Sequence, residues 1–363
     1  MNYDIINKLK KVRILTILLI FTLAVRQLFC QYSEYCDVFY TRGIFPYIRI
    51  LLNCTFGILP FASVYVIFPM LILYFLNKIR RINIADFRQN IAIKMIDFCI
   101  SIFNIISIII VLFFWLWGFN YCSTEPEKIM RITSQNSSEN ELYDMLLVSK
   151  DTLEKMTKRS DFQNRYETIN TRKIDSLVKQ FCSQNINNQL IINKYLPNTA
   201  IRQIQPNGWL SGFGASGIYN LFTGECNIDN DLHHIQKPST IAHEFTHAYG
   251  ITDEGFCNFV AYIVCSKSPN FQDRYSAELM FWRTIAREYK QFDPEKYANL
   301  RSTLSAEIIT DLNDINKTIL EKPVFIENHT EIYDHFLKAQ GEEEGVLSYD
   351  KVIGLVRAWR LKK

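Results

Sequence analysis

The pattern of apolar and polar positions divides the chain near residue 122. Three long apolar stretches precede this point, over about 12–30, 57–76 and 95–119. A helix needs roughly 20 residues to cross a bilayer core of about 30 Å. The pattern therefore predicts that residues 1–122 are a membrane anchor of about three transmembrane helices.

The first stretch also has features of a signal peptide. Four basic residues precede an apolar core over 14–25, as in a cleaved secretory signal. No small-x-small cleavage site follows, and Phe29 before Cys30 does not fit a lipoprotein signal. We therefore favour a retained helix over a cleaved signal.

The rest of the chain reads as a mainly helical α+β structure. Residues 123–200 are polar, with amphipathic helical patterns over 142–156 and 174–182, and are expected to form a helical linking region. Glycines then separate short apolar runs over 201–229, which is typical of strands and turns. Three further helices are expected over 240–249, 253–266 and 276–289, so residues 201–363 are predicted to form one domain with a small sheet.

Charge gives the anchor an orientation. Residues 1–122 hold 12 Lys/Arg and 5 Asp/Glu, whereas residues 123–363 hold 28 and 32. The basic residues concentrate before the first span and after the second, where Lys78, Arg81 and Arg88 lie among them. Positive loops stay inside, so the N-terminus is expected inside and residues after 119 outside. The soluble part has no basic excess, which argues against nucleic-acid binding.

The strongest chemical signal is His243-Glu244-Phe245-Thr246-His247. Helical residues four apart lie on one face, so both imidazoles can bind one metal ion, and Glu244 can hold a water molecule on that metal. A chance match of this kind is expected in roughly one of two hundred such sequences. We therefore expect a zinc site on this helix.

A zinc site with an open position needs a third protein ligand. On one straight helix Glu254 would lie about 10 Å beyond His247, but Gly250 can end the helix in a left-handed turn and let Glu254 return. Asp253 is expected to cap the second helix, and Asn258, one turn after Glu254, to orient a ligand. The other candidates for the third ligand are Asp253, the pair His233 and His234, and Glu278.

Several pieces of sequence resemble a bacterial family of membrane-anchored, zinc metallopeptidase-like proteins. They are residues 115–121, 214–225, 243–265, 333–338 and 348–349. Residues 42–61 also resemble the family's segment that leads into its second span, so the resemblance covers most of the chain. The family pattern has a Glu seven residues after the second His and an Asn four further on, which match Glu254 and Asn258. It also has an acidic residue and an Ala where this chain has Phe256 and Cys257, a departure that favours Glu254 as the ligand.

The resemblance is of the glutamate-zincin type, and it implies a zincin-like peptidase domain on the outer, periplasmic side of the bacterial inner membrane. It also implies that the glycine-rich run over 212–225 is a sheet edge that pairs with an extended peptide substrate. The expected reaction is peptide hydrolysis, with zinc on His243, His247 and Glu254, and Glu244 as the base.

Two other interpretations of the site stand beside this one. One is a non-catalytic envelope protein with a structural or vestigial zinc site, although the intact Glu244 favours catalysis. The other is intramembrane proteolysis, which is disfavoured because the motif lies more than a hundred residues after the last apolar stretch. Within the peptidase hypothesis, the residues considered as oxyanion stabilisers are Tyr219, Tyr275 and Arg283.

Overall fold

The computed structural model describes residues 3–80, 91–186, 198–321, 325, 329–340 and 351–362. Arg81 and Arg88 of the basic loop, and residues 348–349 of the family resemblance, lie outside the described residues. The chain forms two compact units: unit 1 is Met1–Ser123 with Leu221–Thr223, and unit 2 is Thr124–Asn220 with Gly224–Lys363. We describe each unit by itself.

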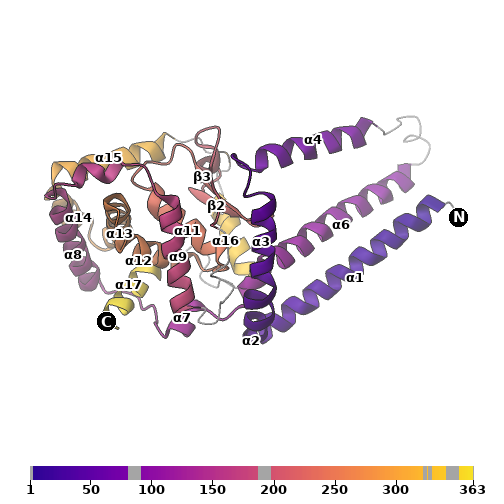
Figure 1. Ribbon diagram of the computed structural model, residues 1–363, viewed down its shortest axis with the longest axis horizontal. Coiled ribbons are helices and arrows are strands. Elements are labelled where there is room, and N and C mark those ends of the chain that lie inside the picture. The colour runs from indigo at the N-terminus through magenta and orange to yellow at the C-terminus, as the bar shows by residue number, and fades with distance from the viewer. Residues whose placement is uncertain are drawn as a thin grey trace. The chain divides into compact units, whose positions relative to one another are not determined.

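Unit 1 is built from helices (Figure 1). Helices α1 (Tyr3–Gln31) and α6 (Ile91–Leu116) pack along each other. Their segments Val12–Gln31 and Phe98–Leu116 are long and apolar enough to cross a membrane. Between them lie α2 (Ser33–Tyr35), the π-helix η1 (Cys36–Ile44), α3 (Phe45–Thr55) and α4 (Val64–Arg80).

The middle apolar stretch differs from the prediction. Its helix, α4, begins at Val64 rather than near residue 57, and residues 57–63 form turns. Gly57 and Pro60 explain the late start, because neither residue favours the interior of a helix. The apolar part of α4, Val64–Tyr74, is shorter than the segments of α1 and α6 that pass the length test.

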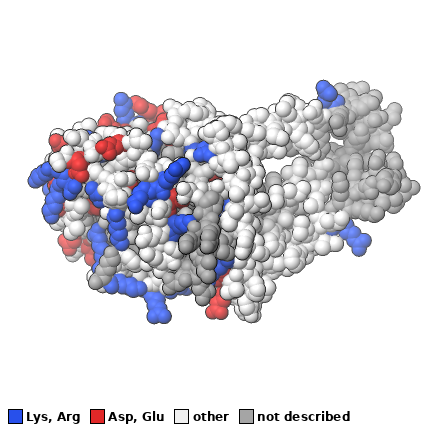
Figure 2. Space-filling model, viewed as in Figure 1, with Lys and Arg blue, Asp and Glu red and all other residues white. Residues whose placement is uncertain are grey.

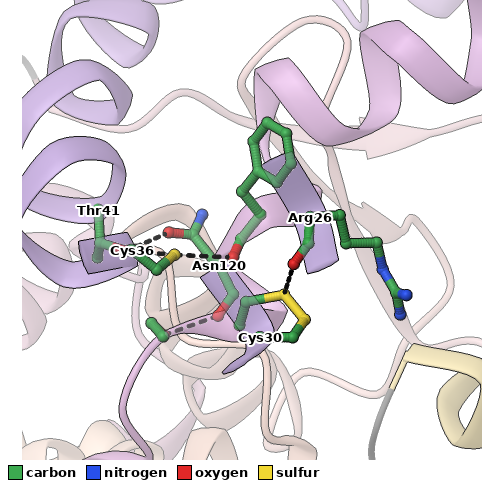
Figure 3. Close-up of a disulfide and its surroundings, with 8 residues drawn as sticks. Arg26, Cys30, Cys36, Thr41 and Asn120 are labelled. Atoms are coloured by element: carbon green, nitrogen blue, oxygen red, sulfur yellow. Dashed lines mark hydrogen bonds between the residues drawn. A yellow bond between two sulfur atoms is a disulfide. The ribbon is translucent and has the colours of Figure 1, made fainter. Parts of the chain in front are cut away.

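A disulfide joins the ends of the two long helices of unit 1 (Figure 3). Cys30 lies at the end of α1, and Cys122 ends the 3-10 helix η2 (Gly118–Cys122) that follows α6. Two polar contacts attach η1 to the same region: the Cys36 thiol donates to the carbonyl oxygen of Phe119 at 3.2 Å, and the Thr41 hydroxyl donates to Asn120 Oδ1 at 3.2 Å.

Unit 2 is mostly helical around a three-stranded sheet, in agreement with the predicted α+β class. The strands β1 (Ile201–Ile204), β3 (Glu225–Asp229) and β2 (Gly217–Asn220) lie in that order. β3 runs parallel to β1 and antiparallel to β2, so β3 is central and all five of its residues are buried. β2 therefore forms one edge of the sheet.

Two central helices pack against this sheet and against each other. Helix α11 (Lys237–Ala248) contacts β2, β3 and α12 (Glu254–Ser266). Phe245 and Ala242 of α11 are fully buried, and the thiol of Cys226 on β3 donates to the carbonyl oxygen of Glu244 at 3.2 Å. The apolar face of α11 is thus fixed in the core.

The remaining helices enclose this centre (Figure 1). Helices α9 (Thr171–Asn185) and α17 (Lys351–Leu361) pack against α12, and α8 (Glu139–Thr157) packs against α13 (Phe271–Phe292). The other elements of unit 2 are α7 (Pro126–Met130), η3 (Phe162–Tyr166), α10 (Trp209–Gly212), α14 (Pro294–Ser302), α15 (Ala306–Leu320) and α16 (His329–Gln340).

Candidate metal centre

The His-Glu-x-x-His sequence lies in the last two turns of α11. Proline in the first turn starts this helix, because the missing N–H of Pro238 leaves no hydrogen bond unmade there. The core-facing side chains Ile241 and Phe245 fix the rotation of the helix. His243 and His247, one turn apart, consequently face the same side.

A tight turn joins α11 to α12. Helix α11 ends at Ala248, and Gly250 has a φ of 88°, the left-handed conformation that glycine adopts without strain. Asp253 then caps α12 by accepting the backbone N–H of Phe256. The first residue of the new helix is Glu254, so the turn brings this carboxylate back to the two imidazoles.

Three ligand atoms converge at this point. His243 Nε2 lies 3.1 Å from His247 Nε2 and 3.0 Å from Glu254 Oε2, and His247 Nε2 lies 3.4 Å from the same oxygen. Ligand atoms about 2.05 Å from a tetrahedral metal are separated from one another by about 3.3 Å. Two imidazole nitrogens and a carboxylate at this spacing can hold one metal ion.

The outer nitrogen of each imidazole is also held. His247 Nδ1 lies 2.8 Å from the backbone oxygen of Ile251, and His243 Nδ1 lies 2.9 Å from Asn258 Oδ1. A carbonyl oxygen only accepts, so Nδ1 carries the proton and the Nε2 lone pair faces the cluster. Asn258 lies where the sequence places an orienting residue, whereas the Ile251 carbonyl was not anticipated, because backbone acceptors leave no signal in a sequence.

Glu244 lies between α11 and the edge strand β2. Its carboxylate accepts the backbone N–H of Tyr219. A Cβ on Gly217 would lie 2.6 Å from Glu244 Oε1, so only glycine leaves room for the carboxylate there. Gly217 was part of the glycine-rich run in the sequence, but its contact with Glu244 was not foreseen.

Burial and charge act on the two carboxylates in different ways. Burial raises the pKa of Glu244, and the nearby imidazoles of His243 and His247 only partly offset this effect. Burial also disfavours a charged Glu254, but contacts with His247 and His243 outweigh it and hold the pKa of Glu254 well below its usual range. Glu254 is thus suited to bind a cation, and Glu244 to take up a proton.

A salt bridge supports the cap of α12. Lys351 of α17 lies 2.8 Å from Asp253 Oδ2 and 2.8 Å from Glu127 Oε1. Both carboxylates are buried, and together they raise the pKa of Lys351 above its ordinary value despite the opposing effect of burial. Lys351 is another residue that the sequence did not reveal, since its partners are far away along the chain.

The other candidate ligands have different partners. His234 Nε2 lies 2.8 Å from the carbonyl oxygen of Glu167, and His233 Nδ1 accepts the backbone N–H of Ile235. Glu278 accepts the hydroxyl groups of Ser149 and Tyr262. None of these side chains belongs to the described metal cluster.

The three candidate oxyanion stabilisers are also separated by the fold. Tyr219 is on β2, and its backbone N–H contacts Glu244. Tyr275 is fully buried and donates to Asp311 Oδ2 at 2.7 Å, while Arg283 donates to Asn316 Oδ1 at 3.1 Å. Only Tyr219 is thereby shown to lie beside the proposed catalytic residue.

Comparison with known proteins identifies a family without an assigned activity. The model of the family "Protein of unknown function (DUF3810)" matches residues 40–357, which include both helices of the metal centre. No curated protein and no solved structure matches the chain significantly.

Proposed function

The chain belongs to the DUF3810 family, and we propose that it is a membrane-anchored zinc metallopeptidase that cleaves peptide bonds outside the cytoplasmic membrane. The observation that carries this proposal is the convergence of His243, His247 and Glu254 next to the buried carboxylate of Glu244. Two histidines and one glutamate are a known ligand set of catalytic zinc, and three protein ligands leave the fourth position open.

The proposed reaction divides the chemistry between the metal and the chain's own residues. A zinc ion at this site would polarise the scissile carbonyl group and lower the pKa of a water molecule towards 7. Glu244 takes a proton from the attacking water and passes it to the leaving nitrogen, for which its raised pKa is suited. Asn258 and the Ile251 carbonyl hold both imidazoles in the tautomer that directs Nε2 inward.

The edge strand β2 offers a place for an extended peptide. The hydrogen bond from Asp229 N to Ser216 O, together with the pairing of Gly217 with Ile228, gives the antiparallel register. In this register the main-chain groups of Gly217 and Tyr219 point away from β3. Glu244 lies on that side, so a peptide added to the edge would pass the proposed base.

Zinc incorporation and peptide cleavage by the full chain in detergent test the proposal. Glu244→Gln is expected to retain zinc and to lower the cleavage rate by at least about 100-fold, because the base contributes about that much. His247→Ala is expected to lose the metal. Glu307→Gln, at an exposed position of α15, is the control and is expected to cleave like the wild type.

Two results would contradict the proposal. Cleavage that survives Glu244→Gln would exclude Glu244 as the base. A wild-type protein that binds zinc fully, with no exchangeable water at the metal and no cleavage of any peptide in a broad library, would favour the alternative of a structural site.

The location outside the membrane rests on features of unit 1. The described face of unit 1 in Figure 2 carries few charged side chains, as expected for a surface in lipid. The Cys30–Cys122 disulfide lies at the C-terminal end of α1 and at the end of η2, the 3-10 helix that follows α6. Disulfides persist in oxidising compartments, so these ends, and unit 2 after them, belong on the outer side.

The same disulfide supports a third crossing of the membrane. If α1 and α6 both cross towards the disulfide, the chain must return between them. Helix α4 is the apolar helix described in that interval, and its 17 residues extend over about 25 Å. This length is slightly less than the bilayer core of about 30 Å. The long side chain of Arg80 at the end of α4 can extend to the inner membrane surface and so span the remaining distance.

A further inference from the structure

A cavity of about 380 Å³ lies between α13, α14 and α15 of unit 2. Small-molecule sites have volumes of about 300–1,000 Å³, so the cavity is large enough for an organic ligand. None of its lining residues belongs to the metal cluster. They are Met280, Trp282, Arg283, Thr284, Ala286, Arg287, Lys290, Tyr297, Arg301, Leu312 and Asn316.

The lining has one sign of charge. It includes four cationic side chains and no carboxylate. Three of the cations, Arg283, Arg287 and Lys290, are spaced i, i+4 and i+7 on α13 and therefore share one face of that helix. Arg301 comes from α14. In Figure 2, Lys and Arg side chains gather over the part of unit 2 where α14 lies, with acidic side chains flanking them.

We infer that this cavity binds a small phosphorylated molecule. Phosphate oxygens match the donor geometry of arginine, and a phosphomonoester carries enough charge to engage several cations at once. The cavity exceeds the size of a phosphate ion, so it leaves space for an organic group beside the charged one.

The charge of Arg283 is the strongest argument for an anionic ligand. Its described hydrogen-bond partner is the neutral amide of Asn316, and no carboxylate pairs with it among the residues that the structure describes. Burial and the like charge of Arg287 lower the pKa of Arg283, with only Tyr297 opposing them. A partly buried cation beside another cation is unfavourable without a counter-charge, and an anionic ligand would supply one.

Arg301 of α14 also has neutral partners. The Arg301 guanidinium donates to the amide oxygen of Asn313 at 2.8 Å and contacts Tyr297. Both partners are neutral, so the positive charge of Arg301 is still available to an anion. The half-buried Met280 adds apolar surface to the lining, which suits the organic part of a ligand.

Binding of pyrophosphate to the full chain tests the inference. Titration calorimetry in phosphatidylcholine nanodiscs, at constant ionic strength, is expected to show saturable binding at one site. The double variant Arg283→Gln/Arg301→Gln is expected to weaken binding at least about tenfold, because hydrogen bonds to charged groups are lost. Lys290→Gln, on an exposed side chain, is expected to weaken it less and carries little risk to folding.

A charge-matched control separates the cavity from general attraction. Lys155→Gln/Arg172→Gln removes two exposed cations from α8 and α9, which do not line the cavity. Pyrophosphate affinity is expected to stay unchanged in this variant. Equal loss in both double variants, or no loss in either, would overturn the inference. The zinc content of Arg283→Gln/Arg301→Gln should remain that of the wild type, so the outcome is independent of the peptidase proposal.

A last comparison identifies the source of the phosphate group. Nanodiscs that contain phosphatidic acid are compared with nanodiscs of phosphatidylcholine alone. Weaker pyrophosphate binding in the first, through competition by the anionic lipid, assigns the cavity to a lipid headgroup. Unchanged binding assigns it to a soluble phosphorylated molecule.

Discussion

Gly217 leaves room for the carboxylate of Glu244 because it has no side chain. The residue lies on β2 at a distance from Glu244 that no Cβ allows. The atoms that would have to move belong to the glutamate side chain and not to the backbone. A larger residue at this position would therefore displace the proposed base while leaving the fold in place.

We predict that Gly217→Ala lowers the peptide cleavage rate by about 10- to 100-fold, since a displacement of about 1 Å has effects of that size. Zinc content and the thermal unfolding midpoint should change little. Combining the substitution with Glu244→Gln should cause no further loss, because both act on the same carboxylate. Steady-state kinetics of the four proteins provide the test, and wild-type activity in Gly217→Ala would contradict the role of this contact.

Glu278 is a second residue whose surroundings matter, because its burial makes folding stability depend on pH. Its carboxylate is buried, accepts the hydroxyl of Ser149 at 2.6 Å and that of Tyr262 at 3.3 Å, and has its pKa raised mainly by burial. A carboxyl group with a raised folded-state pKa contributes stability below its unfolded pKa of about 4.3. This contribution is lost as the pH rises through the folded-state value.

We predict that Glu278→Gln stabilises the protein relative to the wild type near pH 7 but not near pH 4. Glutamine has nearly the same shape and stays neutral, so the variant avoids the burial of a charge at neutral pH. Thermal unfolding of both proteins across this pH range measures the difference. A difference that is the same at every pH would show that ionisation of Glu278 does not affect folding.

At the scale of elements, the metal centre depends on how three helices are joined. Helix α11 supplies two candidate ligands, the turn at Gly250 reverses the chain, and the capped end of α12 supplies the third. Helix α17 contributes Lys351, which holds the capping residue Asp253. The position of Glu254 thus depends on a helix that contains no ligand.

We predict that Lys351→Met destabilises the protein by about 3 kcal/mol, because it leaves Glu127 and Asp253 buried without a counter-charge. Zinc affinity should fall by about 10-fold, as is typical when a residue that supports a ligand is removed. Adding Glu127→Gln should recover part of the stability by removing one of the two charges. Competition with a chelator and thermal unfolding are the measurements, and unchanged zinc affinity would show that Lys351 does not position Glu254.

The sequence predicted the local elements of this site better than its long-range contacts. The spacing of His243 and His247, the glycine at 250 and the cap at Asp253 act within a few residues, and all are recognisable in the sequence. The contacts of Lys351 with Glu127 and Asp253 join segments far apart in the chain. The late start of α4 was missed because apolar residues continue through its preceding turns, where Gly57 and Pro60 were the available signals.

At the scale of the whole molecule, the number of membrane crossings decides where unit 2 lies. A disulfide between the ends of α1 and α6 is compatible with an odd number of crossings before unit 2. Two crossings would place Cys30 and Cys122 on opposite sides of the membrane. With three crossings, the segment between α4 and α6 would lie on the inner side of the membrane.

We predict that a membrane-impermeant maleimide labels Ser160→Cys in intact spheroplasts but labels Asn83→Cys only after lysis. The background for both variants is Cys54→Ser/Cys99→Ser, which removes two exposed thiols. Labelling of Asn83→Cys in intact spheroplasts would exclude α4 as a membrane crossing. Protection of Ser160→Cys would instead place unit 2 inside.

The salt bridge of Lys351 also has a consequence for biosynthesis. The two histidines and Glu254 leave the ribosome about a hundred residues before α17, which at 5–20 residues per second corresponds to roughly 5–20 s. During this interval Asp253 lacks the cation that holds it in the finished protein. If Lys351 positions Glu254 as predicted, the candidate metal site reaches its full affinity only after α17 has been made and docked. A chain interrupted before that point would then carry the complete motif without a complete site.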